Sequence, residues 1–132
     1  MSKLLTGSIR QMTRFLAAFA LSALIAHATA LAGEFRLLML DQEACEWCEQ
    51  WEEDIGGAYH LTQEGKIAPL TRASIHEPLP DGIALERRAG FTPTFVLLED
   101  GTEVGRLEGY AGADFFYPML DRLLRDAGAL AE

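Results

Sequence analysis

The chain contains two cysteines, and two residues separate them in the run Cys45–Glu46–Trp47–Cys48. On the first turn of a helix, residues i and i+3 face the same side, so these two sulfurs can join while Cys45 stays exposed. Backbone N–H groups at a helix start carry partial positive charge, which favours the thiolate of Cys45. The spacing therefore predicts thiol–disulfide exchange, in which Cys45 attacks and the shielded Cys48 resolves the mixed disulfide.

A cysteine pair can also serve other functions. A purely structural disulfide of this spacing would close so small a loop that it would remove little entropy from the unfolded chain. A structural zinc site has four nitrogen or sulfur ligands, and beyond the cysteines only His60 and His76 follow residue 32, neither at a ligand-like spacing. We therefore expect no metal and no cofactor other than the Cys45–Cys48 disulfide. A copper carrier that uses the pair, or a binding module without exchange activity, stays the alternative.

A proline stands directly before an apolar run in the segment Phe91–Thr92–Pro93–Thr94–Phe95. Proline has no N–H to donate to a sheet, so it is uncommon at this place. A cis Thr92–Pro93 bond would turn the chain and leave the backbone of Thr92 free to pair with an extended client peptide. Although trans bonds are commoner, we expect a cis bond that faces the cysteines, with Thr92 and Pro93 as client contacts.

The two tryptophans have different expected roles. Trp51 lies on the apolar stripe of a helix, with Trp47 and Ile55 at four-residue spacing, so we expect it in the core. Trp47 stands between the cysteines and is the third expected client contact. Packing of Trp47 against the loop before Thr92 is the alternative.

Hydrophobic patterns around these residues predict an α/β fold with a mixed β-sheet flanked by helices, in βαβαββα order. The Asp100–Gly101 dipeptide predicts a two-residue hairpin turn between the last two strands. The predicted strands are 35–40, 70–75, 94–98 and 103–107; the predicted helices are 45–55, 83–89 and 114–126, with a second short helix at 62–68 that Thr62 caps and Pro69 ends.

A cysteine pair after a strand, followed by Thr–Pro before a hairpin and a terminal helix, resembles the thioredoxin superfamily. The segments LTQEGKIAPLTR, PLPDG, FTPTFVL and GRLEGYAGADFFYPML resemble more specifically the SoxS family, the periplasmic thioredoxin-like proteins of bacterial sulfur-oxidation clusters. This resemblance runs from Phe35 to about Leu124. It implies a thioredoxin-like fold, active-site cysteines at Cys45 and Cys48, a cis-proline at Pro93, and a role in keeping the sulfur carrier SoxY in a usable thiol state.

One position departs from the thioredoxin pattern. Thioredoxins carry a buried aspartate six residues before the first cysteine, and Met39 stands there in this chain. A buried proton acceptor for Cys48 is therefore not obvious. Asp41 is nearer in sequence, and we expect it to be more exposed.

Three glutamates crowd the cysteine pair: Glu43, Glu46 and Glu49. Negative charges oppose the thiolate and offset some of the helix-start effect, although solvent screening weakens them. A less stable thiolate generally gives a less oxidising couple, so we expect a reductant rather than an oxidant. A generic dithiol reductase is the less specific version of this prediction.

Residues 1–32 have the pattern of an export signal. Lys3, Arg10 and Arg14 precede the apolar run 15–26, and small residues that suit a signal peptidase follow at 28–32. Twelve helical residues span about 18 Å, short of the ~30 Å of a bilayer core. We expect a cleaved signal peptide at 1–32, with an inner-membrane anchor as the alternative, and a thioredoxin-like domain at 33–132 in the periplasm, where disulfide chemistry is permitted.

Charge narrows the class of partner. The formal net charge of the 132 residues is −9, but from Gly33 onward 8 basic residues face 20 acidic ones, a balance of −12. Such a domain repels phosphate backbones and anionic membrane surfaces, which argues against nucleic acid and against stable membrane insertion after cleavage. The expected partners are a protein client with a reactive cysteine or disulfide, which the resemblance suggests is SoxY, and a membrane electron donor.

Overall fold

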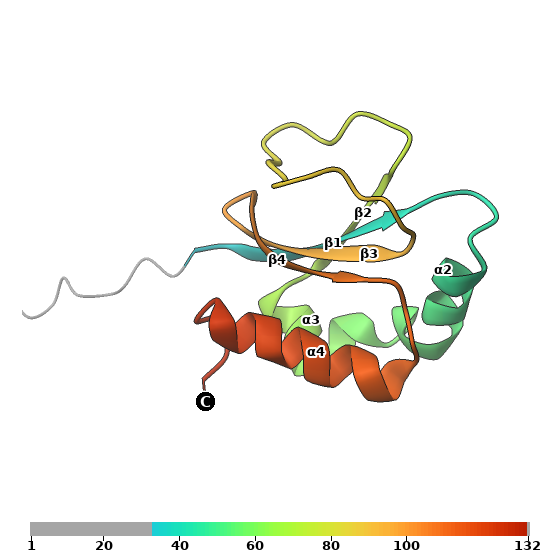
Figure 1. Ribbon diagram of the computed structural model, residues 1–132. Coiled ribbons are helices and arrows are strands. Elements are labelled where there is room, and N and C mark those ends of the chain that lie inside the picture. The colour runs from blue at the N-terminus through green and yellow to red at the C-terminus, as the bar shows by residue number, and fades with distance from the viewer. Residues whose placement is uncertain (1–32, 132) are drawn as a thin grey trace, which may run out of the picture. The chain divides into compact units, whose positions relative to one another are not determined.

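The computed structural model describes residues 33–131, and the expected signal peptide at 1–32 lies outside them. A four-stranded mixed sheet in the order β2-β1-β3-β4 forms the centre of this part of the chain (Figure 1). Its strands are β1 (Phe35–Asp41), β2 (Leu70–Ser74), β3 (Thr94–Glu99) and β4 (Thr102–Glu108). The predicted strands and the mixed sheet are therefore confirmed.

The strand register brings the cysteine loop and the Thr92–Pro93 segment to the same edge of the sheet, where β1 ends and β3 begins. β1 runs parallel to β2, with Leu40 beside Ala73, and antiparallel to β3, with Leu40 beside Thr94. The carboxyl end of β1 therefore lies beside the start of β3. The loop to Cys45 and the Thr92–Pro93 segment both leave the sheet at this edge.

The predicted hairpin joins β3 to β4. Asp100 and Gly101 both have positive φ, 49° and 82°, which is the backbone of the two-residue turns that match the twist of paired strands. Glycine adopts such angles at no steric cost, and aspartate tolerates them better than most residues.

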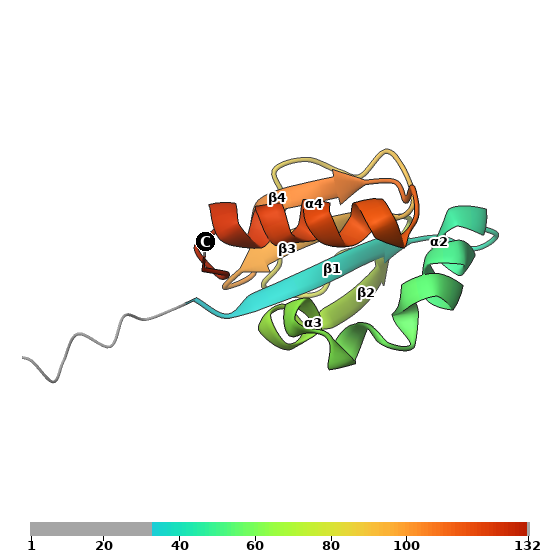
Figure 2. The same cartoon turned by 90° about the horizontal axis from the view of Figure 1, so that it is seen from below.

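All the described helices lie on one face of the sheet (Figures 1 and 2). Thr62 caps α3 as predicted, because its Oγ1 accepts a hydrogen bond of 3.0 Å from the N–H of Gly65. The α-helices are α2 (Glu46–Trp51), α3 (Gln63–Ile67) and α4 (Ala113–Asp126); a π-helical turn (Glu52–Gly56) extends α2, and a 3₁₀ turn (Tyr59–Leu61) precedes α3. No helix in residues 33–131 is long and apolar enough to cross a membrane.

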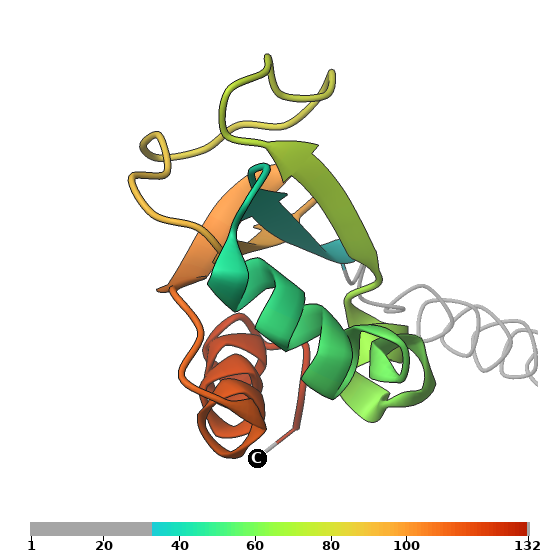
Figure 3. The same cartoon turned by 90° about the vertical axis from the view of Figure 1, so that its right-hand side faces the viewer.

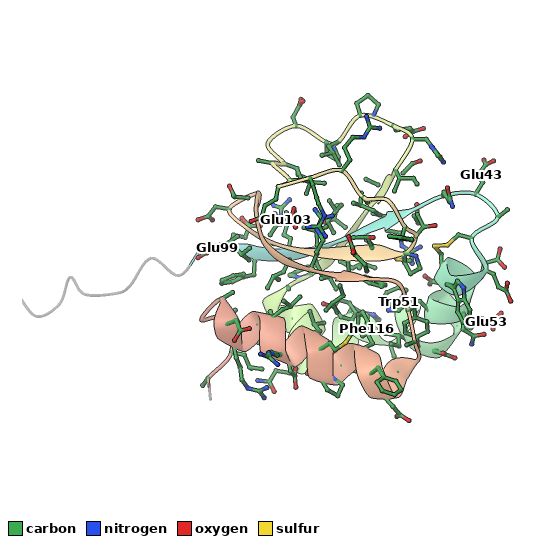
Figure 4. The ribbon with its side chains drawn as sticks, in the orientation of Figure 1. Glu43, Trp51, Glu53, Glu99, Glu103 and Phe116 are labelled. Carbon is green, nitrogen blue, oxygen red and sulfur yellow. A yellow bond between two sulfur atoms is a disulfide. The ribbon has the colours of Figure 1, made fainter. Side chains whose placement is uncertain are left out.

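An aromatic cluster fills the layer between the sheet and the helices. The ring centroid of Trp51 lies 5.3 Å from that of Phe95 and 5.9 Å from that of Phe116, and the last two are 4.9 Å apart. Figure 4 shows Trp51 and Phe116 pointing into this layer from α2 and α4. These tilted and edge-on contacts add to the burial of apolar area, so the predicted core position of Trp51 is confirmed.

The opposite face of the sheet is buried as well, but no helix covers it. Leu38, Leu40, Val96 and Leu98 form a second apolar cluster there. The long segment 75–93, between β2 and β3, lies across them on the side away from the helices (Figure 3). Burial on both faces explains why β1 and β3 are continuous apolar runs rather than alternating ones.

The helix predicted at 83–89 is wrong, and so is the second α in the predicted order. This stretch is irregular, with bends at Glu86 and Arg87, and Ala84 forms a parallel bridge with Thr102. The N–H of Ala84 donates to the carbonyl of Gly101 at 2.9 Å, and the N–H of Glu103 donates to the carbonyl of Ala84 at 2.9 Å. A backbone that is satisfied by β4 cannot also make the internal hydrogen bonds of a helix.

A buried ion pair holds the same stretch against β4. Arg106 donates to Glu103 through Nε at 2.5 Å, and its Nη2 donates to the carbonyl of Arg87 at 2.9 Å. Glu103 in turn accepts the N–H of Glu86 at 2.8 Å. Only 6% of the Arg106 side chain and 2% of the Glu103 side chain are exposed. Contacts between distant residues, rather than local helix propensity, therefore decide the conformation here.

Candidate active site

The disulfide lies where the sequence places it, at the junction of β1 and α2 (Figure 4). Cys45 is the N-cap of α2, with an extended backbone at φ −93° and ψ 97°, and its Cα lies 5.2 Å from that of Cys48. The N–H of Cys48 donates to the Sγ of Cys45 at 3.2 Å. In the reduced protein the same N–H and the helix start would stabilise a thiolate on Cys45.

The two cysteines do not differ in accessibility as expected. In the disulfide form 7% of Cys45 and 8% of Cys48 are exposed, so Cys45 is not the open member of the pair. In the disulfide each sulfur covers the other. The expected difference in exposure between Cys45 and Cys48 concerns the reduced thiols, which this form does not contain. What separates the cysteines in this structure is the helix-capping position of Cys45.

The Thr92–Pro93 peptide bond is cis, as expected from the sequence. Pro93 is buried, and its carbonyl accepts a 2.7 Å hydrogen bond from the N–H of Gly109. Within residues 33–131 the backbone of Thr92 makes no hydrogen bond. A free backbone in the loop that leads into a strand is available to pair with an extended peptide.

Two exposed aromatic side chains come from the segments that meet at this edge. Trp47 is 56% exposed, which agrees with its expected position outside the core. Phe91, two residues before Pro93, is 67% exposed and was not singled out from the sequence. Its position in the same motif as Pro93 is the signal that would have identified it.

Within residues 33–131, no buried carboxylate replaces the thioredoxin aspartate. Met39 is fully buried in the helix-side cluster. Asp41 is half-buried and engaged by Arg72, whose Nη1 lies 3.6 Å from its Oδ2. Arg72 also pairs with Glu52 and lies over the ring of Trp51, 5.7 Å from its centroid. Asp41 is therefore held in a partly exposed ion pair.

The glutamates around the pair are all exposed. Glu43, Glu46 and Glu49 form no ion pair within the described part of the chain. Figure 4 shows Glu43 on the loop between β1 and α2, pointing away from the core. Their charges are uncompensated, but solvent screens them.

A tyrosine–aspartate hydrogen bond close to the site was not predicted from the sequence. Tyr110, in the loop before α4, donates from its hydroxyl to the Oδ2 of Asp54 at 2.9 Å. Burial, together with this hydrogen bond, raises the pKa of Tyr110 to about 12. The phenol therefore stays protonated at neutral pH. The partners are 56 positions apart in the sequence, which explains why no local pattern signals the contact.

The histidines lie on surface loops. His60 is exposed in the 3₁₀ turn, and the Nε2 of His76 lies 2.9 Å from the Oε1 of Gln42. In the described residues no three His, Cys, Asp or Glu side chains come together as metal ligands would. A copper carrier would have only the two sulfurs, which here are bonded to each other.

A disulfide at a helix start, beside a cis-proline at the edge of a mixed sheet, defines a thioredoxin-like thiol–disulfide oxidoreductase. The structure is similar to the crystal structure of the periplasmic thioredoxin SoxS from Paracoccus pantotrophus in its reduced form. The TM-score is 0.68 and the sequence identity 50%, over 73% of this chain and 98% of that one. The chain belongs to the SoxS family of thioredoxins, which confirms the family and the fold predicted from the sequence. No protein-family model and no curated protein matches the chain.

Proposed function

We propose that the protein reduces disulfides of a client protein in the periplasm. The thiolate of Cys45 attacks a client sulfur and expels the other sulfur as a thiolate. Cys48 then attacks the Cys45 sulfur and releases the client cysteine, so two electrons pass to the client and the Cys45–Cys48 disulfide forms. The observation that carries these roles is the capping position of Cys45, whose Sγ accepts the N–H of Cys48.

The direction of electron flow follows from the charges around the pair. Glu43, Glu46 and Glu49 are exposed and disfavour the thiolate that the helix start stabilises. A less stabilised thiolate makes the disulfide less oxidising. An oxidising compartment also has little need of a further oxidant, so a reductant fed by a membrane electron donor suits the site best.

The family supports the proposed client and the proposed compartment. The similar structure is described as a periplasmic thioredoxin SoxS, and residues 1–32 have the pattern of a cleaved export signal. The resemblance to that family suggests the sulfur carrier SoxY as client, whose cysteine must be cleared of unwanted disulfides. Trp47 and the Thr92–Pro93 segment would contact it, because they flank the disulfide at the open edge.

A comparison of two substrates tests this function. The reduced protein should release a blocking thiol from the sulfur carrier at least tenfold faster than it reduces insulin. The Cys48→Ser variant should accumulate a mixed disulfide with the carrier, while Cys45→Ser should not. Equal rates on the two substrates would leave only a generic dithiol reductase. A reduction potential as positive as that of a dedicated oxidant would overturn the direction.

A further inference from the structure

The segment 75–93 leaves a pocket of about 420 Å³ on the face of the sheet away from the helices. This volume is typical of sites that take a small molecule or a large side chain. Leu40, Leu79 and Leu85 supply apolar lining, so the pocket can bury an apolar group.

The pocket lies at the same edge of the sheet as the disulfide. Leu40 is the penultimate residue of β1 and comes five residues before Cys45. Ala89, which also lines the pocket, comes four residues before Pro93. The hydrogen bond between His76, on the pocket rim, and Gln42 ties the pocket to the loop that carries Cys45. A peptide whose cysteine reacts with Cys45 therefore passes close to this pocket.

One rim residue carries a charge that the fold does not use. Arg88 lines the pocket, is exposed, and is the one arginine in residues 33–131 without an ion pair; the others, Arg36, Arg72, Arg87, Arg106, Arg122 and Arg125, all pair with carboxylates. Glu77 stands on the same rim and forms no ion pair with Arg88. The domain as a whole, with a net charge of −12, repels acidic ligands. At this pocket, however, the unpaired guanidinium of Arg88 can attract a carboxylate.

We infer that this pocket is a specificity site for the client, and that Arg88 selects it. The client segment next to the reacting cysteine places a large apolar side chain in the pocket and a neighbouring carboxylate against the guanidinium of Arg88. This inference rests on the proposed function, because it assigns the substrate class of the same site. A single carboxylate is recognised locally, while a generally acidic client is still repelled by the remaining surface.

Matched peptide disulfides test the inference. The peptides contain one cysteine, joined to 2-thiopyridine as a mixed disulfide, and carry Leu–Glu or Leu–Gln two to four residues from the cysteine; they have no charged group besides that glutamate. This spacing spans roughly 7–13 Å of extended chain. The thiolate of Cys45 attacks the peptide sulfur and expels thiopyridone, whose absorbance gives the rate. For at least one spacing we expect kcat/KM to be about two- to fivefold higher for the glutamate peptide, as for an exposed ion pair.

Variants assign that preference to the pocket. Arg88→Gln should erase the preference for glutamate, and Arg88→Glu should invert it. Ala89→Leu should lower the rates of both leucine peptides by filling the pocket. Lys66→Gln is the matched control, because Lys66 is exposed, lies on α3 across the sheet and forms no ion pair in residues 33–131. It removes the same charge and should leave both rates unchanged.

A binding measurement separates failure of the pocket from failure of the redox function. Peptides with serine in place of cysteine are titrated into the oxidised, ¹⁵N-labelled protein. The amides of His76, Arg88 and Ala89 should shift, with tighter binding of the glutamate peptide. Three results would overturn the inference. The rates could be equal for both peptides at every spacing, Lys66→Gln could change the preference as much as Arg88→Gln does, or these amides could fail to shift. A protein that binds the serine peptides but reduces no disulfide would overturn the proposed function instead.

Discussion

The two faces of the sheet are buried to a similar degree by different means. On one face, α2 and α4 pack aromatic side chains into a continuous cluster that includes both cysteines. On the other face, the irregular segment 75–93 covers four strand residues and is held by a strand bridge and the Arg106–Glu103 pair. Regular helices give the redox pair a fixed position. A segment without regular structure leaves room for a pocket beside it.

The largest effect should come from the cysteine pair on the helix face. Cys45→Ser should abolish disulfide reduction, because it removes the attacking thiolate, and the fold should persist around the remaining core. Activity on a client disulfide and circular dichroism measure the two outcomes. In the reduced wild-type protein, iodoacetamide should modify Cys45 before Cys48 at neutral pH. The reverse order would exchange the proposed roles.

The next largest effect separates the stability of the two faces. Phe116→Ala should lower the free energy of unfolding by about 3–5 kcal/mol, because it leaves a cavity among Trp51, Phe95 and α4. Leu85→Ala, in the segment 75–93, should cost only about 1–2 kcal/mol, since Leu85 is only half-buried. Denaturant unfolding of both variants measures the difference. Equal losses would show that the two faces contribute alike.

A third variant releases the covering segment. Glu103→Gln should destabilise the protein by about 3 kcal/mol, because the charge of Arg106 stays buried without its partner. Hydrogen exchange at the amides of Ala84 and Glu86 should accelerate, while exchange in α4 should change less. Unchanged exchange at these two amides would mean that the bridge to β4 alone holds the segment.

The ion pair between Arg106 and Glu103 also predicts how the stability of the protein changes with pH. Burial by itself would raise the pKa of Glu103, but the hydrogen bonds from Arg106 and from the N–H of Glu86, together with the charges of Arg106 and Arg87, outweigh it and hold that pKa below its usual value. The stabilisation is therefore present above the unfolded pKa of about 4.3 and is lost as the pH falls through the folded value. Glu103→Gln should remove this part of the acid destabilisation. If the free energy of unfolding fell equally steeply at acid pH in the variant and in the wild type, the prediction would be wrong.

The smallest effect concerns the hydrogen bond between Tyr110 and Asp54. Tyr110→Phe should cost about 1 kcal/mol at neutral pH. Because the folded pKa of Tyr110 is raised to about 12, its contribution is complete below about pH 10 and is lost as the pH rises through 12. The variant should therefore lose less stability than the wild type between pH 10 and 12. Thermal unfolding at these pH values provides the measurement, and parallel curves would contradict it.

The sequence predicts the helix face better than the opposite face, for a physical reason. The cysteine spacing, the Asp100–Gly101 turn and the apolar stripe through Trp51 are local patterns, and the structure contains all three. The run 83–89 contains good helix formers, yet it is not helical because Gly101 and residues of β4, 17 to 19 positions away, satisfy its backbone hydrogen bonds. The pocket beside Arg88 depends on that conformation, so no local pattern predicts it.

The bridge between Ala84 and Thr102 also has a consequence for self-association. An open sheet has two outer edges, and the unpaired N–H and C=O groups of an edge strand are a template for another chain. In this fold the N–H of Glu103 and the carbonyl of Gly101, at the start of the outer strand β4, are already occupied by Ala84. The stretch 83–89, for which the sequence predicts a helix, thus covers the start of the edge strand β4. If it detached, the damage would appear first as concentration-dependent aggregation rather than as loss of the redox pair.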